Sequence, residues 1–320
     1  MNEIIEKIGK IGLVPVIKIE DVEKAVPLAK ALCEGGLPCA EVTFRTAQAE
    51  EAIRRITEAL PEMLVGAGTV LTTEQVDRAV GAGAKFIVSP GFNRKIVTYC
   101  IEKGIPVTPG CSSPSDVEQA IECGLDVVKF FPAEAAGGLP MIKAMCGPYT
   151  NLKFMPTGGI SAKNLNDYLS FKKILACGGS WMVKEDLIQS GDFAAITALA
   201  REAVGTMLGF ELAHVGINAA NEEEASKTAN AFCSIFNFAP KAGNSSIFAG
   251  TAVEVMKTPY LGKNGHIAIR TNYLERAINY LEMQGVQFDE STKKFNAKGE
   301  MVAIYMKDEI GGFAVHLVQK

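Results

Sequence analysis

The segment VVKFFP, residues 127–132, places a lysine in the middle of a continuous apolar run. A run of this length is typical of a strand that is buried on both faces, as in a parallel sheet. Lysine is strongly hydrated and is rarely buried completely unless a partner compensates its charge. The segment therefore predicts a buried strand and raises the question of why Lys129 lies in it.

Seven similar β-rich runs occur from residue 13 to residue 180, and segments with helical patterns separate them. The eight runs are LVPVIKI (13–19), CAEVTF (39–44), LVGAGTV (64–70), FIVSP (86–90), PVTPG (106–110), VVKFFP (127–132), KFMPTGG (153–159) and KILACGGS (173–180). Asp21, Thr72 or Thr73, and Ser112 or Ser113 are suitable N-caps for three of the intervening helices. Eight regular repeats favour a closed (β/α)8 TIM barrel over an open, doubly wound sheet.

The pattern changes after residue 208. Strand patterns at HVGINA, SIFAG and AVEVMK surround a helical pattern at NEEEASKTANAFCSIF, and a second pass follows through GHIAIR, YLERAINYLEMQG, MVAIYMK and FAVHLVQ. Two similar halves indicate an internal repeat of β-α-β-β type. We therefore expect two domains, an α/β barrel at residues 1–208 and a smaller α+β domain at residues 209–320.

The composition argues against several classes of partner. Thirty-six acidic and 32 basic residues give a net charge of −4 without a basic, aromatic-rich cluster, so we expect no nucleic-acid partner. No apolar run is long enough to span a bilayer, and the N-terminus MNEIIEKIGK does not resemble a signal peptide. The eight cysteines form no CxxC pair, which indicates reduced thiols. These features predict a cytoplasmic protein without a membrane partner.

Barrel enzymes carry their chemistry at the C-terminal ends of the strands. The polar or glycine-rich positions at these ends are Glu41, Arg45, Thr69, Pro90, Lys129, Thr157, Gly158, Gly159, Gly178, Gly179 and Ser180. Lys129 has two interpretations, a structural ion pair, as we expect for Lys18, or a nucleophile. Desolvation favours the neutral amine, which can attack a carbonyl carbon and form an iminium that draws electrons. The local sequence alone leaves both interpretations open.

Six motifs in register with these runs resemble the KDPG aldolase family: EVTFR (41–45), GAGTV (66–70), SPG (89–91), VKFFPA (128–133), PTGGI (156–160) and GGSWM (178–182). Members of this family are class I aldolases that act on 2-keto-3-deoxy-6-phosphogluconate and 4-hydroxy-2-oxoglutarate. The resemblance covers residues 1–208. It implies a (β/α)8 barrel, a homotrimer, pyruvate as a product, and a covalent lysine imine in place of any metal or other cofactor.

The resemblance also implies roles for individual residues. Lys129 would form the Schiff base, and Glu41 would move protons with the help of a water molecule. Arg45 and Thr69 would hold the carboxylate end of pyruvate, which suits the planar fork of an arginine side chain. The pocket would be lined by Pro90, Phe131 and Thr157. The phosphate end of the substrate would lie against Gly158, Gly159 and Ser180.

The glycines of PTGG and CGGS also have a physical reason to bind an anion. Glycine allows backbone N–H groups to approach a phosphate closely, and the N-terminus of a helix favours negative charge. We expect a helix to start directly after each motif. Taken alone, a pair of glycines indicates only a tight turn.

All three histidines lie in the predicted second domain, together with a suitably placed glutamate. His214 opens the first half-repeat and His266 opens the second, while Glu254 and His316 occupy equivalent late strands. The pattern resembles the glyoxalase, bleomycin-resistance and extradiol-dioxygenase group, the vicinal oxygen chelate fold, in which paired β-α-β-β-β modules form a cupped sheet. The resemblance implies a divalent metal held by these four residues, with His316 in place of the usual glutamate. Imidazole and carboxylate ligands suit Zn, Fe, Ni or Mn.

Several functions therefore remain open at the level of sequence. The barrel is expected to be a class I aldolase, and the alternative is another sugar-phosphate barrel enzyme, an isomerase or epimerase, which forms no imine. The second domain is expected to be either a metal-dependent lyase or isomerase or a ligand-binding sensor. The three histidines are the support for the enzymatic alternative. Against this alternative, an isolated histidine is more often structural.

Overall fold

A computed structural model describes residues 2–320 of the chain. The chain divides into two compact units, and the boundary lies between Met207 and Leu208. We call the first the barrel unit and the second, Leu208–Lys320, the C-terminal unit.

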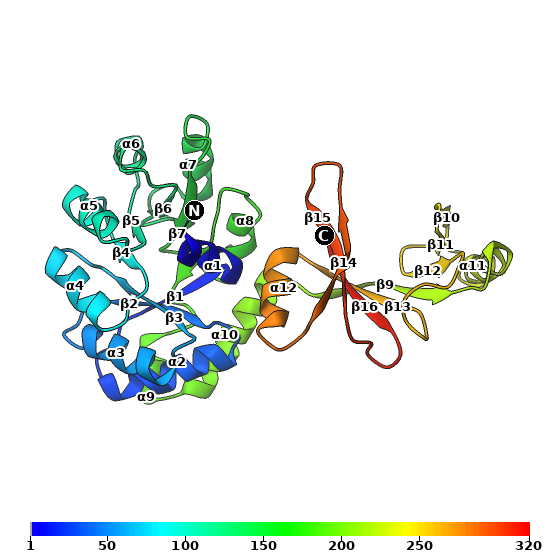
Figure 1. Ribbon diagram of the computed structural model, residues 1–320, viewed down its shortest axis with the longest axis horizontal. Coiled ribbons are helices and arrows are strands. Elements are labelled where there is room, and N and C mark those ends of the chain that lie inside the picture. Colours follow the sequence, from blue (N-terminus) through cyan, green and yellow to red (C-terminus); the bar gives the residue numbers. More distant parts are fainter. Residues whose placement is uncertain (1) are drawn as a thin grey trace. The chain divides into compact units, whose positions relative to one another are not determined.

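The barrel unit contains eight parallel strands, one within each of the eight expected runs. They are β1 (Leu13–Ile17), β2 (Cys39–Thr43), β3 (Leu64–Gly68), β4 (Ile87–Ser89), β5 (Val107–Pro109), β6 (Val127–Phe130), β7 (Lys153–Pro156) and β8 (Cys177–Gly179). Hydrogen bonds connect β5-β4-β3-β2-β1-β8 into one sheet and β6 with β7 into another. Parallel bridges from Gly110 to Lys129 and from Thr157 to Gly178 join the two sheets at both edges. Every strand thus has two neighbours, and the strands form an α/β barrel (Figure 1).

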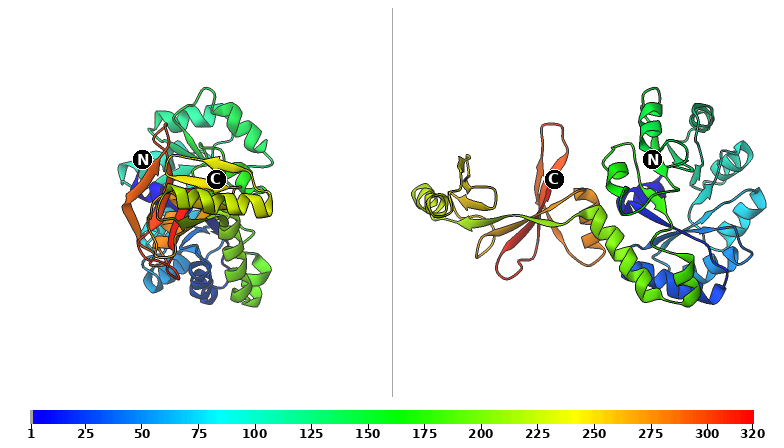
Figure 2. Two further views of the ribbon diagram at one scale, coloured as in Figure 1. Left: turned by 90° about the vertical axis from the view of Figure 1, so that its right-hand side faces the viewer. Right: turned by 180° about the vertical axis from the view of Figure 1, so that it is seen from behind.

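Helices surround the strands on the outside, as both the front and the rear views show (Figures 1 and 2). They are α1 (Glu3–Ile11), the 3-10 helix η1 (Val22–Lys24), α2 (Ala25–Glu34), α3 (Ala49–Ala59), α4 (Thr73–Gly81), α5 (Arg94–Glu102), α6 (Pro114–Glu122), α7 (Gly138–Met145), α8 (Leu165–Leu169), α9 (Glu185–Ser190) and α10 (Phe193–Leu208). The side chains of Asp21, Thr72 and Ser113 cap η1, α4 and α6, as expected. Within residues 2–320, no helix is both long and apolar enough for a bilayer.

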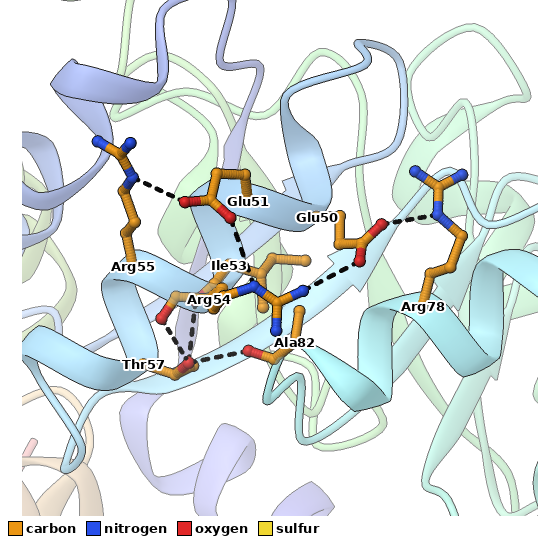
Figure 3. Close-up of polar contacts among 8 residues, drawn as sticks. All are labelled: Glu50, Glu51, Ile53, Arg54, Arg55, Thr57, Arg78 and Ala82. Atoms are coloured by element: carbon orange, nitrogen blue, oxygen red, sulfur yellow. Dashed lines mark hydrogen bonds and ion pairs between the residues drawn. The ribbon is translucent and has the colours of Figure 1, made fainter.

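Polar contacts join neighbouring helices on the outer surface of the barrel (Figure 3). The carboxylate of Glu50 on α3 accepts hydrogen bonds from Arg54, 3.0 Å away on the same helix, and from Arg78, 2.7 Å away on α4. The hydroxyl of Thr57 on α3 donates to the carbonyl of Ala82, which follows α4. Exposed ion pairs contribute little individually, so these contacts add only a small amount to the stability of the barrel.

The C-terminal unit is one mixed sheet with two helices. Its elements are β9 (Glu211–Asn218), α11 (Glu222–Phe236), β10 (Pro240–Ala242), β11 (Ser246–Ala249), β12 (Val253–Met256), β13 (His266–Thr271), α12 (Leu274–Glu282), β14 (Phe288–Phe295), β15 (Met301–Met306) and β16 (Ala314–Gln319). The strand order is β10-β11-β12-β9-β13-β16-β15-β14, so two consecutive β-α-β-β-β segments meet where β9 pairs antiparallel with β13. In Figure 2, α11 and β10–β12 lie together at one end of this sheet.

The strand patterns predicted a β-α-β-β repeat, whereas the resemblance implied β-α-β-β-β modules, and the structure has two strands that the patterns did not locate. These are β10 and β14, the two edges of the sheet. All three residues of β10 are exposed, and its first residue is a proline. Edge strands commonly carry proline and charged residues because one side of their backbone faces solvent, and these residues hide the strand pattern.

Candidate active site

Lys129 and Glu41 form a buried pair inside the barrel. Lys129 is on β6 and Glu41 is on β2, and their side chains are almost completely excluded from solvent. Nζ of Lys129 lies 3.2 Å from Oε1 and 3.4 Å from Oε2 of Glu41. A buried charge that loses its partner is strongly destabilising, so each of these side chains depends on the other. The apolar run around Lys129 is therefore compatible with its charge because Glu41 faces it.

Gly68 makes room for the Glu41 carboxylate. A Cβ atom at Gly68, the last residue of β3, would lie 2.1 Å from Oε1 and 2.6 Å from Cγ of Glu41. Any side chain at this position would displace the carboxylate from Lys129. Sequence reasoning used Gly68 only as part of the GAGTV motif, because its steric role depends on how β2 and β3 pair.

Thr69, directly after Gly68, has a left-handed backbone with φ of +55°. This conformation is rare for a β-branched residue and costs on the order of 1–3 kcal/mol. Strain of this kind persists where the surrounding structure imposes it, and it clusters at functional sites. The left-handed backbone of Thr69 is compatible with a functional position at the C-terminal end of β3, and its expected contact with the substrate carboxylate stays a prediction.

Thr43 holds the side chain of Arg45. The Nε of Arg45 donates to Oγ1 of Thr43 at 3.1 Å, and Oγ1 of Thr43 donates to the carbonyl oxygen of Ile17 at 2.8 Å. Thr43 is buried and follows Glu41 by two residues on β2, so both side chains point to the same side of the strand. That spacing was the available signal for Thr43, which the sequence analysis did not single out.

The ends of β4, β5 and β6 approach one another closely beside Lys129. Nζ of Lys129 lies 5.4 Å from the centre of the Phe131 ring. A Cβ atom at Gly110 would lie 2.0 Å from the carbonyl oxygen of Pro90, and Gly110 is bridged to Lys129. The structure therefore brings both of these predicted pocket residues, Phe131 and Pro90, to the region of the lysine.

The predicted phosphate residues form turns after β7 and β8. Gly158 and Gly159 have φ values of +101° and +82°, which glycine adopts without strain. A Cβ atom at Gly178, within β8, would lie 2.4 Å from Oγ1 of Thr157, so Thr157 at the end of β7 packs closely against β8. Helix α8 starts at Leu165 and α9 starts at Glu185. The expectation that a helix follows each glycine motif directly is wrong, because irregular segments intervene.

Lys18 forms ion pairs, as the sequence predicted for it. Its Nζ lies 2.8 Å from Oε1 of Glu20 and 3.5 Å from Oε2 of Glu185. The hydrogen bond to Glu20 raises the pKa of Lys18, so the side chain remains charged. Lys18 is partly exposed and thus differs from the buried Lys129, although both lie in apolar runs.

The C-terminal unit contains a second cluster of ionisable side chains. His214, Glu254, His266 and His316 lie on β9, β12, β13 and β16, four neighbouring strands at the middle of the sheet. Oε2 of Glu254 is 3.0 Å from Nε2 of His214 and 3.1 Å from Nε2 of His266, and these two nitrogens are 3.2 Å apart. The nitrogens of all three histidines lie within 4.8 Å of one another. The structure thus brings together all four residues that the sequence singled out.

The register of the strands explains why these side chains converge. Ala268 on β13 pairs with His214 on one side and His316 on the other. Gly216 on β9 lies between His266 and Glu254 in the same way. A Cβ atom at Gly216 would lie 1.9 Å from the His266 ring. Small residues thus leave the space that the larger side chains fill.

Ionisable groups in this cluster have shifted pKa values. Burial alone would raise the pKa of Glu254, but hydrogen bonds from His214, His266 and Ser246 outweigh it and hold that pKa well below its usual range. Burial, followed by the neighbouring imidazoles, lowers the pKa of His316 to about 3. The cluster therefore combines one carboxylate with a neutral imidazole at His316.

Several nitrogens of this cluster have no hydrogen-bond partner within residues 2–320. They are Nδ1 of His266 and both ring nitrogens of His316. The ring of Tyr305 stacks on the ring of His316 at 4.4 Å and contributes no hydrogen bond to it. Buried polar atoms are nearly always paired, so unpaired ones point to a bound ion or water.

The fold is an α/β barrel, and a lysine and a carboxylate are buried together within its strands. These features place the protein in the class of barrel enzymes. Comparison with known proteins specifies the family. The family model described as "KDPG and KHG aldolase" matches residues 4–199, which lie within the barrel unit. The chain therefore belongs to the KDPG and KHG aldolase family and is an aldolase.

Individual relatives agree with this assignment. The 2-dehydro-3-deoxy-phosphogluconate aldolase of Treponema pallidum is 50% identical over 204 residues, which are 64% of this chain and 97% of the relative. The KHG/KDPG aldolase of Escherichia coli K12 is 47% identical over 192 residues, which are 60% of this chain and 90% of the relative. A crystal structure of the KDPG aldolase from Legionella pneumophila, with pyruvate captured as a covalent carbinolamine, matches with 40% identity and a TM-score of 0.61. That match covers 62% of this chain and 97% of the Legionella chain.

Proposed function

We propose that the barrel unit is a class I aldolase that cleaves 2-keto-3-deoxy-6-phosphogluconate to pyruvate and glyceraldehyde 3-phosphate, 4-hydroxy-2-oxoglutarate to pyruvate and glyoxylate, or both. The observation that carries this proposal is the buried contact between Lys129 and Glu41. A lysine in this setting has a base within reach that can remove a proton from its ammonium group. The relatives named as aldolases of these two substrates support the choice of reaction.

The reaction starts with the transfer of a proton from Lys129 to Glu41, which leaves a neutral amine. The amine attacks the C2 ketone, and Glu41, acting through a water molecule, protonates the resulting hydroxyl group, which leaves as water. The iminium then draws the electrons of the C3–C4 bond as a base removes the proton of the C4 hydroxyl group. The aldehyde leaves first. Protonation of the enamine and hydrolysis of the imine then release pyruvate and restore the amine.

The remaining site residues would bind the two ends of the substrate. Arg45 and Thr69 would hold the pyruvate carboxylate, and the bond from Arg45 to Thr43 supports a fixed position for the guanidinium group. Pro90, Phe131 and Thr157 would line the pocket. The phosphate would accept hydrogen bonds from the turns at Gly158, Gly159 and Ser180. Backbone N–H groups in such turns form concavities that bind anions.

Borohydride trapping tests the covalent step. Incubation with pyruvate and borohydride should reduce the imine and attach a stable mass adduct to the tryptic peptide that contains Lys129. The variant Lys129→Ala should form no adduct, whereas Lys18→Ala should form as much as the unaltered protein. Absence of the adduct, or an adduct that persists in Lys129→Ala, would contradict the proposal and favour a sugar-phosphate isomerase or epimerase.

The domain organisation and assembly belong to the same proposal. Residues 1–208 would form a (β/α)8 aldolase domain that assembles as a homotrimer and needs no cofactor. Residues 209–320 would form a domain of the glyoxalase type, and the repeated β-α-β-β-β order supports this. Deletion of residues 210–320, followed by light scattering and an assay of cleavage, separates the two parts. A monomeric or inactive truncated barrel would contradict this division.

The second cluster supports a second candidate function for the C-terminal unit. We propose that His214, Glu254, His266 and His316 hold a divalent metal ion and make this unit a metal-dependent lyase or isomerase. The observation that carries this proposal is the set of distances between three of the ligand atoms, 3.0, 3.1 and 3.2 Å. Ligand atoms about 2.0–2.2 Å from one ion have such mutual distances. The metal would polarise a carbonyl oxygen or lower the pKa of a bound water.

Elemental analysis of protein purified without a metal-affinity tag tests this second function. We expect about one equivalent of Zn, Fe, Ni or Mn per chain, since these ions suit imidazole and carboxylate ligands. His214→Ala should lose the metal, whereas Lys129→Ala should retain it. If the protein contains no metal and takes up none from solution, the C-terminal unit is a metal-free module such as a sensor.

A further inference from the structure

A tyrosine and a carboxylate meet beside the turn that follows β7. The hydroxyl of Tyr168 on α8 donates a hydrogen bond to Oε1 of Glu134, which follows β6. Tyr168 is buried, and burial together with the contact to Glu134 raises its pKa. The phenol therefore keeps its proton and acts as a donor, and Glu134 is the acceptor. Neither residue has a part in the reaction proposed above.

Glu134 contacts the Thr157–Gly159 turn with both its backbone and its side chain. Its backbone N–H donates to the carbonyl oxygen of Gly158 at 3.1 Å, and the N–H of Ala133 donates to that of Thr157 at 2.8 Å. A Cβ atom at Gly159 would lie 2.5 Å from Cγ of Glu134. The Glu134 side chain therefore covers Gly159 on the side where any other residue would carry its Cβ atom.

The segment that leads into α8 holds the same turn from a second direction. Nδ2 of Asn164 donates to the carbonyl oxygen of Gly159 at 3.1 Å, and Oδ1 of Asn164 accepts from the N–H of Ser161 at 2.8 Å. The carbonyl oxygens of Gly158 and Gly159 are thus both occupied by protein donors. Within residues 2–320, the N–H group of Gly159 donates to no other residue, so it remains available as a donor to an anion.

We propose that Glu134 and Tyr168 are positioning residues that fix this turn so that the N–H group of Gly159 meets the substrate phosphate. The inference rests on the proposed aldolase function and goes beyond it, because it assigns a task to a pair that makes no contact with the reacting atoms. Tyr168 also keeps the Glu134 carboxylate bonded in one place. A freed carboxylate next to the turn would repel the phosphate.

A matched pair of substrates separates this role from a general effect on catalysis. 2-Keto-3-deoxy-6-phosphogluconate and its dephosphorylated form share the carbon skeleton and the bond that breaks. For Tyr168→Phe and Glu134→Ala, we expect KM for the phosphorylated substrate to rise about tenfold or more. The reason is that the turn is no longer held in place, so its hydrogen bonds to the charged phosphate weaken. KM for the dephosphorylated substrate and kcat for both should stay within about twofold of the unaltered enzyme.

Two further variants serve as controls. Tyr149→Phe removes the same kind of bond, in which a phenol donates to Glu118 at 2.9 Å on the exposed surface, and it should change neither KM. Glu134→Gln keeps an acceptor oxygen for Tyr168 and should restore most of the affinity that Glu134→Ala loses. Glu134 is exposed, so its variants are informative even if Tyr168→Phe does not fold.

Three outcomes are distinguishable. A rise in KM for the phosphorylated substrate alone supports the positioning role. An unchanged KM in Glu134→Ala, or an equal rise for both substrates, overturns it. Borohydride trapping with pyruvate reports separately on Lys129, so loss of the adduct in the unaltered enzyme would contradict the aldolase function itself and not the role of this pair.

Discussion

The barrel site and the histidine cluster both bury ionisable side chains, but they balance charge in different ways. In the barrel, the ammonium group of Lys129 and the carboxylate of Glu41 compensate each other at 3.2 Å. In the C-terminal unit, Glu254 contacts the imidazoles of His214 and His266, and Nδ1 of His266 and both ring nitrogens of His316 have no partner within residues 2–320. In the first site the two charged groups are each other's partner, and Glu41 is the base that the proposed covalent catalysis uses. The second site joins Glu254 to His214 and His266 by short polar contacts and leaves both ring nitrogens of His316 without a partner within residues 2–320, an arrangement compatible with the metal site proposed above.

The largest effect in this comparison is expected when the carboxylate of the Lys129–Glu41 pair is replaced by a neutral amide. Glu41→Gln removes the proton acceptor of Lys129 and should reduce kcat for cleavage about 10²–10⁴-fold, the range of a general acid or base. Imine formation with pyruvate should persist, although more slowly. Steady-state kinetics and borohydride trapping measure the two effects. A variant that cleaves at the normal rate would show that the pair is structural.

A steric change at Gly68 should act through the same contact. Gly68→Ala places a methyl group where the Glu41 carboxylate lies, and displacement of a catalytic group by about 1 Å can reduce the rate about 10²-fold. Assays of cleavage measure this loss. The control is Gly81→Ala on α4, where a Cβ atom would have no neighbour within 4 Å. That variant should keep full activity, since alanine is also the better helix former.

The equivalent steric change in the second cluster is Gly216→Ala. The added methyl group overlaps the ring of His266 and should push it out of the cluster. Loss of a hydrogen-bond partner of a ligand typically reduces metal affinity about 10–100-fold, so displacement of His266 itself should reduce it by at least that factor. Titration of the metal-free protein with Zn²⁺ measures it. Unchanged affinity would mean that His266 is not a ligand.

The smallest effect is expected on the rate of cleavage when a chelator removes the metal from the C-terminal unit. Treatment with a chelator should lower the melting temperature of the protein, because a bound ion stabilises the folded state by about 2.7 kcal/mol at a hundredfold excess over Kd. The rate of cleavage should change by no more than about twofold, since sites without shared partners act nearly independently. Calorimetry and the aldolase assay provide the two readings. A large loss of cleavage would place a metal in the barrel reaction and end the contrast between the sites.

Strands in the interior of a sheet could be predicted from the sequence, whereas the strands at the edges of the C-terminal sheet could not. The eight apolar runs of the barrel each contain a strand because buried strands need continuous apolar sequence. The edge strands β10 and β14 were missed because exposed strands carry no such constraint. Gly68 and Gly216 were missed for another reason, since their importance lies in the side chains of neighbouring strands. Thr43 was missed although its spacing from Glu41 on the same strand was an available signal.

The sequence by itself determined the alternation of strands and helices, three of the helix caps and the side chains able to carry chemistry. These features depend on hydrophobic periodicity and on interactions between residues that are close in the chain. Only the tertiary structure decided that Lys129 meets Glu41, 88 residues away, and that Glu254 meets two histidines of other strands. Such contacts depend on strand register and barrel closure, because a shift of one residue would turn each side chain to the opposite face of its sheet.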